Sequence, residues 1–185
     1  MTTRRRFLAI SAAAFAMPNV ALAQPEYTWS GIALGAQATI RLAHPDADAL
    51  TTRAAAEISR LEDVFSLYRG DSALSRLNQT GKLASPPFEL LECLSIAGAV
   101  HHATDGRFDP TVQTLWTTYA EAAVKGVPPG ADALSRALAV TGWAGVTLDE
   151  SAIVLRPGLQ LTLNGIAQGY IADRIAALLA AEGLT

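Results

Sequence analysis

Tyr68 is the first residue of the chain whose type and position could do chemistry. It follows an amphipathic stretch and precedes Gly70-Asp71, a dipeptide typical of a turn, after which Asp71 or Ser72 is expected to cap a new helix. An aromatic ring at the end of a helix can stack on a planar ligand. From this segment alone, the alternative that Tyr68 is a core or rim side chain stays open.

A second segment with possible chemistry runs from Thr104 to Val112. Asp109 precedes Pro110, which favours an extended backbone at Asp109, and Thr111 follows closely. A carboxylate and backbone polar groups therefore converge at one turn, where they could contact a ligand. The same pattern is typical of a capped helix start, and the segment alone does not separate the two interpretations.

The third segment is the turn at Asn164-Gly165, between an apolar pattern that ends near Leu163 and a helical pattern that begins near Ile166. The first turn of a helix presents backbone N–H groups that suit a phosphate. Small residues there also let the backbone approach a ligand or metal closely. Many strand-to-helix turns contain such glycines, so this pattern is weak by itself. The glycine-bent pattern over Gly31–Ile40 shows no chemistry of its own.

Both helices and strands are needed to position these segments. Apolar residues at steps of three and four predict helices over 46–68, 85–106, around Trp116 and Tyr119, over 132–140 and over 166–181. Ser85 is expected to cap the second of them. Strand patterns occur over 27–42, 145–149, 152–156 and 159–163, with a hairpin at Glu150-Ser151. Because strands and helices occur in runs, the sequence predicts an α+β fold.

Composition and charge exclude some function classes. The formal net charge is -3, so no nucleic-acid partner is expected. Cys93 is the single cysteine, which rules out an internal disulfide, and its apolar helical surroundings are typical of a buried, inert thiol. His101 and His102 lie near the end of the predicted 85–106 helix, where imidazolium complements the helix dipole, and no third metal ligand follows at suitable spacing.

The N-terminus has the features of an export signal. Three arginines at positions 4–6 precede an apolar stretch from Ala9 to Met17, which is too short to span a membrane and leads to small residues up to Ala23. The pattern predicts a signal peptide over 1–23 that resembles the twin-arginine type, with an ordinary secretory signal as the alternative. Removing it would change the net charge from -3 to -6 and leave one domain over 24–185, which we expect in the periplasm.

In chain order, four segments resemble conserved blocks of the ApbE family of FAD:protein FMN transferases. The family blocks are a Met-Gly-Thr strand, a Ser-x-Tyr-x-x-x-Ser-x-Leu-Ser-x-Leu-Asn segment, a Gly-x-Phe-Asp-x-Thr turn and a Gly-Ile-Ala-Lys-Gly-Tyr-x-x-Asp helix start. They correspond here to 31–40, 66–78, 106–111 and 165–173. The resemblance spans about Gly31 to Leu179, and it implies an ApbE-like flavin transferase fold that is incomplete at the C-terminus.

The resemblance implies an FAD site. Tyr68 would contact the FAD, and Arg107, Phe108 and Asp109 would line its pocket. Leu34 stands at a cofactor-binding position where the family usually has a methionine.

The resemblance also implies a magnesium ligand and two departures. The backbone carbonyl of Gly165 would bind Mg²⁺. Gln168 stands where a lysine or glutamate that touches the cofactor is usual, and Thr162 replaces a common aspartate. Both positions are expected to contact the FAD, in a variant subgroup with altered adenylate contacts.

The family reaction cleaves the FAD pyrophosphate, releases AMP and joins the FMN phosphate to a Ser or Thr hydroxyl of a target protein. Mg²⁺ neutralises phosphate charge while the hydroxyl attacks. The family's other metal ligands come from a later Asp/Thr block that is not found before Thr185, so we expect the sequence to be cut short. The alternatives are a periplasmic FAD-binding module without transferase activity, or an inactive fragment.

Overall fold

The structure is a computed structural model that describes residues 26–184. The predicted signal peptide over 1–23 lies outside the described residues. Within the described part, no helix is long and apolar enough to cross a membrane. The helices are α1 (Ala47–Phe65), α2 (Ala73–Thr80), α3 (Phe88–Ala103), α4 (Gln113–Val124), α5 (Ala131–Val140) and α6 (Ala167–Ala181). The strands are β1 (Tyr27–Ala33), β2 (Ala36–Leu42), β3 (Lys82–Ala84), β4 (Val146–Leu148) and β5 (Ala152–Leu155).

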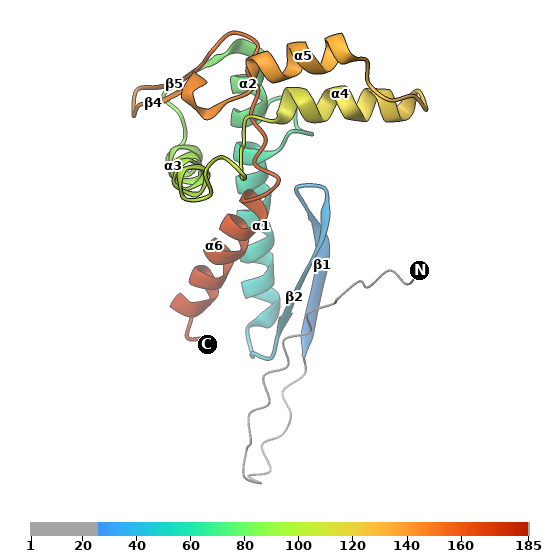
Figure 1. The fold of residues 1–185 in the computed structure, drawn as a ribbon. Coiled ribbons are helices and arrows are strands. Elements are labelled where there is room, and N and C mark those ends of the chain that lie inside the picture. Colours follow the sequence, from blue (N-terminus) through green and yellow to red (C-terminus); the bar gives the residue numbers. More distant parts are fainter. Residues whose placement is uncertain (1–25, 185) are drawn as a thin grey trace.

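Helix α1 is the central element of the fold. Its apolar residues recur at steps of three and four, and those at Leu50, Ala54, Ile58, Leu61 and Phe65 are buried. The β1–β2 hairpin packs along this helix, and α6 also lies against it (Figure 1). Helix α1 therefore connects the N-terminal hairpin to the C-terminal helix of the described chain.

The β1–β2 hairpin has a two-residue turn at Leu34-Gly35. The strands are antiparallel and Ala33 pairs with Ala36, which leaves only these two residues in the turn. Both have a positive φ, 50° at Leu34 and 78° at Gly35. This conformation matches the twist of a hairpin, but it is unfavourable for a residue with a side chain such as Leu34. The predicted bend at Gly35 is confirmed.

The second sheet has three antiparallel strands in the order β3-β5-β4. Leu148 pairs with Ile153, and the predicted hairpin around Glu150-Ser151 is confirmed. Strand β3 was not predicted, because three residues are too few for a period-two pattern. Helices α4 and α5 pack against each other and extend to one side of this sheet (Figure 1).

Two local predictions were wrong. The segment 159–163 forms no strand of its own and makes only an isolated bridge between Gln160 and Val112. Its alternating leucines are buried, so the pattern reflects burial without a neighbouring strand. Ser85 does not cap α3. Its φ of 46° and its N–H bond to the Ser151 carbonyl place it in a turn, and α3 begins three residues later.

The main core joins the helices to the three-stranded sheet. Its buried side chains come from the β1–β2 turn, α1, α2, β3, α3, β5, the 159–163 segment and α6. Cys93 is one of them, as predicted. The mixture of helices with two separate antiparallel sheets confirms the α+β class.

Candidate functional site

The loop that carries Tyr68 is fixed by buried serine hydroxyls. Ser66 Oγ accepts hydrogen bonds from the backbone N–H groups of Tyr68 (3.0 Å) and Arg69 (3.1 Å). The Ser66 carbonyl accepts hydrogen bonds from the hydroxyls of Ser72 and Ser75. Ser72 also caps α2 by accepting the Ser75 N–H at 3.0 Å, as predicted for this position. The serines of this block therefore hold the backbone of Tyr68 in one conformation.

The Tyr68 side chain projects into solvent beside the β1–β2 turn. Helix α1 ends at Phe65, three residues earlier than predicted, so Tyr68 leaves its buried face and is 70% exposed. The ring lies close to Gly35, where an added Cβ would sit 3.1 Å from Tyr68 Cε2. Glycine at position 35 therefore lets the ring lie against the backbone of the turn. The exposed part of the ring remains accessible to a planar ligand.

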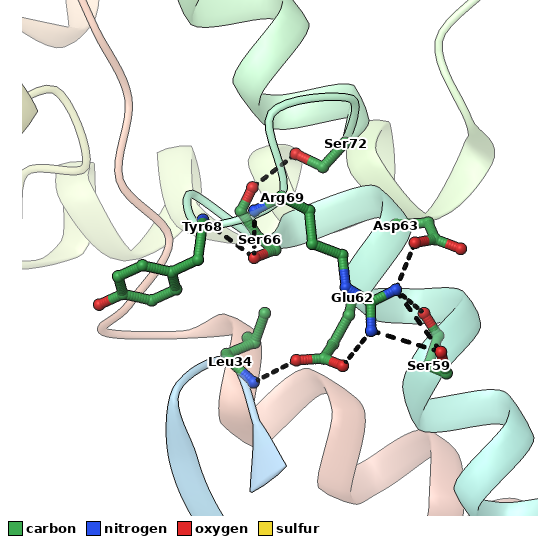
Figure 2. Close-up of polar contacts among 8 residues, drawn as sticks. All are labelled: Leu34, Ser59, Glu62, Asp63, Ser66, Tyr68, Arg69 and Ser72. Atoms are coloured by element: carbon green, nitrogen blue, oxygen red, sulfur yellow. Dashed lines mark hydrogen bonds and ion pairs between the residues drawn. The ribbon is translucent and has the colours of Figure 1, made fainter.

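A carboxylate connects this loop to the β1–β2 turn. The Leu34 N–H donates to Glu62 Oε1 at 2.9 Å, and Arg69 Nη2 donates to Glu62 Oε2 at 2.6 Å (Figure 2). Arg69 also donates to Asp63. The Asp63 hydrogen bond and the nearby carboxylate charges raise the pKa of the Arg69 guanidinium, which keeps it charged.

Leu34 takes part in this arrangement mainly through its backbone. Its side chain is buried in the main core, only 8% exposed, while its N–H faces Glu62. The Leu34 side chain therefore points from the turn into the core, whereas the Tyr68 ring lies against the turn on the solvent side.

Phe108 occupies a second turn, which follows α3. Its N–H donates to Thr104 Oγ1 at 3.1 Å, and its carbonyl lies 2.9 Å from His101 Nδ1. The Phe108 ring is half-buried against the core and lies close to Gly165, where an added Cβ would sit 3.1 Å from Phe108 Cε2. Phe108 and Gly165, two predicted site residues from distant segments, are therefore close together. His101 has a structural role, because its ring nitrogen lies within hydrogen-bond distance of the Phe108 carbonyl.

The Asp109 carboxylate accepts hydrogen bonds from its own turn. Its Oδ1 accepts hydrogen bonds from the Thr111 N–H (2.8 Å) and hydroxyl (2.6 Å). Thr111 is fully buried, and its Oγ1 accepts the Gly142 N–H at 2.7 Å. The Thr162 N–H donates to the Pro110 carbonyl at 2.8 Å, which places Thr162 beside this turn. Asp109 therefore supports the turn that presents Phe108.

Asn78 holds the segment that leads to Gly165. Its side chain donates to the Leu161 carbonyl and accepts the Leu161 N–H, both at 2.8 Å. Next along the chain, Thr162 Oγ1 accepts the Asn164 N–H at 3.3 Å. The segment thus reaches the N-terminus of α6 with its backbone bonded to two other parts of the fold.

Gln168 and Tyr170 both lie in the first turn of α6 but have different surroundings. Gln168 is exposed and lines a groove of about 480 Å³ between α6 and the β1–β2 hairpin, which also includes Ala33 and Ala36 beside the turn. Tyr170 packs edge-on against Phe65, with ring centroids 5.3 Å apart. Its hydroxyl donates to Glu92, and burial together with that carboxylate raises the pKa of the Tyr170 phenol. Tyr170 therefore holds α6 in place.

The Arg107 side chain lies at the surface of the Phe108 turn. Its side chain is 80% exposed and its Nη1 lies 3.7 Å from the Asp105 carboxylate and 3.3 Å from the Thr104 carbonyl. Its guanidinium is therefore a surface charge at the edge of the Phe108 turn.

The side chains of residues 26–184 do not form a magnesium site by themselves. Across residues 26–184, no group of three or more His, Cys, Asp or Glu side chains is placed to hold a metal ion. Mg²⁺ requires octahedral oxygen ligation, commonly with one or two carboxylates, which a single Gly165 carbonyl does not provide. Among the described residues, the Gly165 carbonyl is therefore at most one of several ligands that such an ion would need.

Sequence reasoning missed the residues that support the site. Glu62 belongs to the polar face of α1, and nothing in its spacing indicates a partner at Leu34, 28 residues away. Asn78 bonds to Leu161 across 83 residues, which local patterns do not show. Ser66 and Thr111 carry a weaker signal, since small hydroxyl residues often bond to the backbone of tight turns.

Relatives with a known name match most of this chain. It is 31% identical over 157 residues to the FAD:protein FMN transferase of Klebsiella pneumoniae (strain 342), covering 80% of this chain and 48% of that protein. It is also 31% identical over 147 residues to the FAD:protein FMN transferase of Vibrio cholerae serotype O1, covering 75% of this chain and 43% of that protein. The chain thus spans about half the length of these relatives.

Solved structures give the same result for the fold. The flavin transferase ApbE from Vibrio cholerae has a TM-score of 0.76 at 26% identity, covering 86% of this chain and 54% of that one. The Pseudomonas stutzeri flavinyl transferase ApbE, in its apo form, has a TM-score of 0.71 at 25% identity, covering 83% and 52%. The predicted ApbE-like fold is confirmed. Because residues 34–185 match the family's sequence pattern, the chain belongs to the ApbE family.

Proposed function

We propose that this chain provides the FAD-binding part of an FAD:protein FMN transferase. The relatives that it matches are named for this activity. The observation that carries the proposal is the position of Tyr68, whose ring is 70% exposed although its backbone is held by buried hydrogen bonds. A rigidly held, exposed aromatic ring is suited to stacking on an isoalloxazine or adenine ring.

In the proposed reaction, a Ser or Thr hydroxyl oxygen of an acceptor protein attacks the phosphorus of the FMN half of FAD. The new P–O bond forms as the pyrophosphate P–O bond breaks, AMP leaves, and the hydroxyl proton is released. Mg²⁺ would neutralise phosphate charge in this reaction, and the Gly165 carbonyl would be one ligand to it, although the side chains of residues 26–184 do not form a site for the ion by themselves. We propose that the Asn164-Gly165 turn and the start of α6 face the phosphates, since a helix N-terminus favours anions.

A second candidate is an FAD-binding module without transferase activity. It is favoured by Thr162 and Gln168, which replace charged residues of the family pattern. The two candidates share the FAD site and differ in whether AMP is released when FAD, Mg²⁺ and an acceptor protein are supplied together.

Titration calorimetry with FAD tests the shared part of the proposal. The unsubstituted chain should bind FAD, and Tyr68→Ala should weaken binding by about 1 to 3 kcal/mol, the range for stacking on an aromatic side chain. Tyr119→Ala is the matched control, because Tyr119 is 52% exposed on α4 and lies outside the proposed site. Equal FAD affinity of the Tyr68 and Tyr119 variants would show that Tyr68 is a surface residue that does not contact FAD.

Transfer is tested by incubating the chain with FAD, Mg²⁺ and a flavin-acceptor protein. A fluorescent acceptor band in a denaturing gel, with release of AMP, supports the transferase. Binding of FAD without either product supports the binding module.

We further propose export to the periplasm through a twin-arginine-type signal over residues 1–23. The support is the run of arginines at 4–6 before a short apolar stretch. A reporter fused to residues 1–30 should be exported, and changing both Arg4 and Arg5 to Lys should stop its export although the charge is kept. Undiminished export of the double variant would point to the ordinary secretory route.

A further inference from the structure

Glu62 joins two segments that are distant in the sequence and meet beside Tyr68. Its side chain is 14% exposed, and each of its oxygens has a separate partner, the Leu34 N–H at 2.9 Å and the Arg69 guanidinium at 2.6 Å. Figure 2 shows the Glu62 carboxylate between Leu34 of the hairpin turn and Arg69 of the loop after α1. The Tyr68 ring lies on the opposite side of Leu34 from this carboxylate in that view.

The turn at Leu34-Gly35 needs such a partner. Leu34 has a left-handed backbone with a φ of 50°, which is unfavourable for a residue with a side chain. Its N–H lies in a two-residue turn, and the acceptor it finds is a carboxylate. A hydrogen bond to a charged group is stronger than one between neutral groups, so Glu62 can hold the turn in this conformation.

The position of the turn determines what lies beside the Tyr68 ring. Gly35 is the residue that the ring approaches, since an added Cβ there would lie 3.1 Å from Cε2. Movement of the turn would open this contact or press on the ring. Arg69 is bonded through its N–H to the same Ser66 hydroxyl as Tyr68, so its ion pair with Glu62 ties the loop to the same carboxylate.

We propose that Glu62 is a positioning residue for flavin binding, which fixes the Leu34-Gly35 turn against Tyr68 so that turn and ring form one wall of the site. This inference rests on the proposed function, because it requires Tyr68 to contact FAD. Asp63 offers a matched comparison. It also pairs with Arg69, but it is 66% exposed and has no bond to the hairpin among the described contacts.

The first measurement needs no ligand. Hydrogen exchange of the Leu34 amide should be about tenfold faster in Glu62→Ala than in the unsubstituted chain, because its charged acceptor is lost. Glu62→Gln keeps an oxygen acceptor and should recover part of the protection. Asp63→Ala should leave this amide unchanged. Unchanged Leu34 exchange in Glu62→Ala, with the helical circular dichroism intact, would overturn the proposal.

The second measurement is FAD affinity in a double-mutant cycle. Glu62→Ala should weaken FAD binding about tenfold in the unsubstituted chain but less than about twofold in the Tyr68→Ala background, since the carboxylate acts through that ring. Glu62→Gln should bind FAD more tightly than Glu62→Ala, and Asp63→Ala should bind like the unsubstituted chain. An equal loss in both backgrounds would show a general effect on the fold and overturn the positioning role. Failure of the unsubstituted chain to bind FAD would instead overturn the proposed function, while the exchange measurement would still decide whether Glu62 fixes the turn.

Discussion

Two corners of the molecule place an aromatic ring against a glycine in similar ways but with different surroundings. We call them the Tyr68 corner, made of Tyr68 and the Leu34-Gly35 turn, and the Phe108 corner, made of Phe108 and Gly165. In both, a Cβ added to the glycine would lie 3.1 Å from the ring. The Tyr68 ring is 70% exposed, whereas the Phe108 ring packs against the main core. The same contact therefore leaves a ring accessible to a ligand in one corner and contributes to stability in the other.

The corners also differ in how they are held. The Phe108 turn is held by several contacts, from Thr104 and His101 close by in the sequence and from Thr111 to Gly142 across 31 residues. The Tyr68 corner depends on the contact of Glu62 with Leu34 across 28 residues. Changes at the Phe108 corner should therefore alter folding stability, and changes at the Tyr68 corner should alter ligand binding.

The largest expected difference is between the two aromatic residues themselves. Phe108→Ala should lower the free energy of unfolding by about 2 kcal/mol, because it removes a half-buried ring from the edge of the core. Tyr68→Ala should change it by less than about 0.5 kcal/mol, as expected for an exposed side chain. Urea denaturation followed by circular dichroism measures both. Equal losses in the two variants would remove the distinction between the corners.

A smaller effect is expected from the glycine of the Phe108 corner. Gly165→Ala should destabilise the chain by about 1 kcal/mol, because the new methyl group meets the Phe108 ring at 3.1 Å. Gly169→Ala is the control within α6. An added Cβ there meets nothing within 4 Å, and alanine should stabilise the helix by roughly 0.5 kcal/mol. If both variants shift the unfolding midpoint in the same direction, the Phe108 ring does not constrain position 165.

The smallest effect concerns Cys93, which is buried in the main core on α3. Burial, with a further contribution from Glu92, raises the pKa of its thiol from 9.0 to about 12. The protonated thiol therefore contributes stability that is fully present below the unfolded pKa and is lost as the pH rises from 9.0 to about 12. Between about pH 8 and pH 9.5, the free energy of unfolding should therefore fall by about 0.8 kcal/mol more in the unsubstituted chain than in Cys93→Ala. A flat difference between the two proteins over this range would mean that the thiol ionises normally and that the core is open there.

Much of the fold could be predicted from local patterns. The apolar spacing of α1, the glycine bend between β1 and β2 and the β4–β5 hairpin are all short-range features, and the structure contains them. The 159–163 segment shows the limit of such reasoning. Its buried alternating leucines look like a strand, but a strand needs a neighbouring strand, which a local pattern cannot supply.

The residues of the candidate site could also be predicted only in part from the sequence. The family blocks pointed to Tyr68 and Phe108, and the structure shows how each ring is placed. The contacts that hold them, from Glu62 to Leu34 and from Asn78 to Leu161, cross 28 and 83 residues. Such contacts depend on the tertiary arrangement and leave no periodic signal in a single sequence.

In the proposed site, FAD contacts both the Tyr68 corner and the start of α6. Titrating FAD into the isotopically labelled chain and following its backbone amide resonances tests this most directly. The amide resonances of Gly35, Tyr68 and Gly165 should shift together, with the same dissociation constant, while those of the β4–β5 hairpin should not move. Shifts confined to the β4–β5 hairpin, or to the far end of the groove near Leu42 and Leu179, would contradict it.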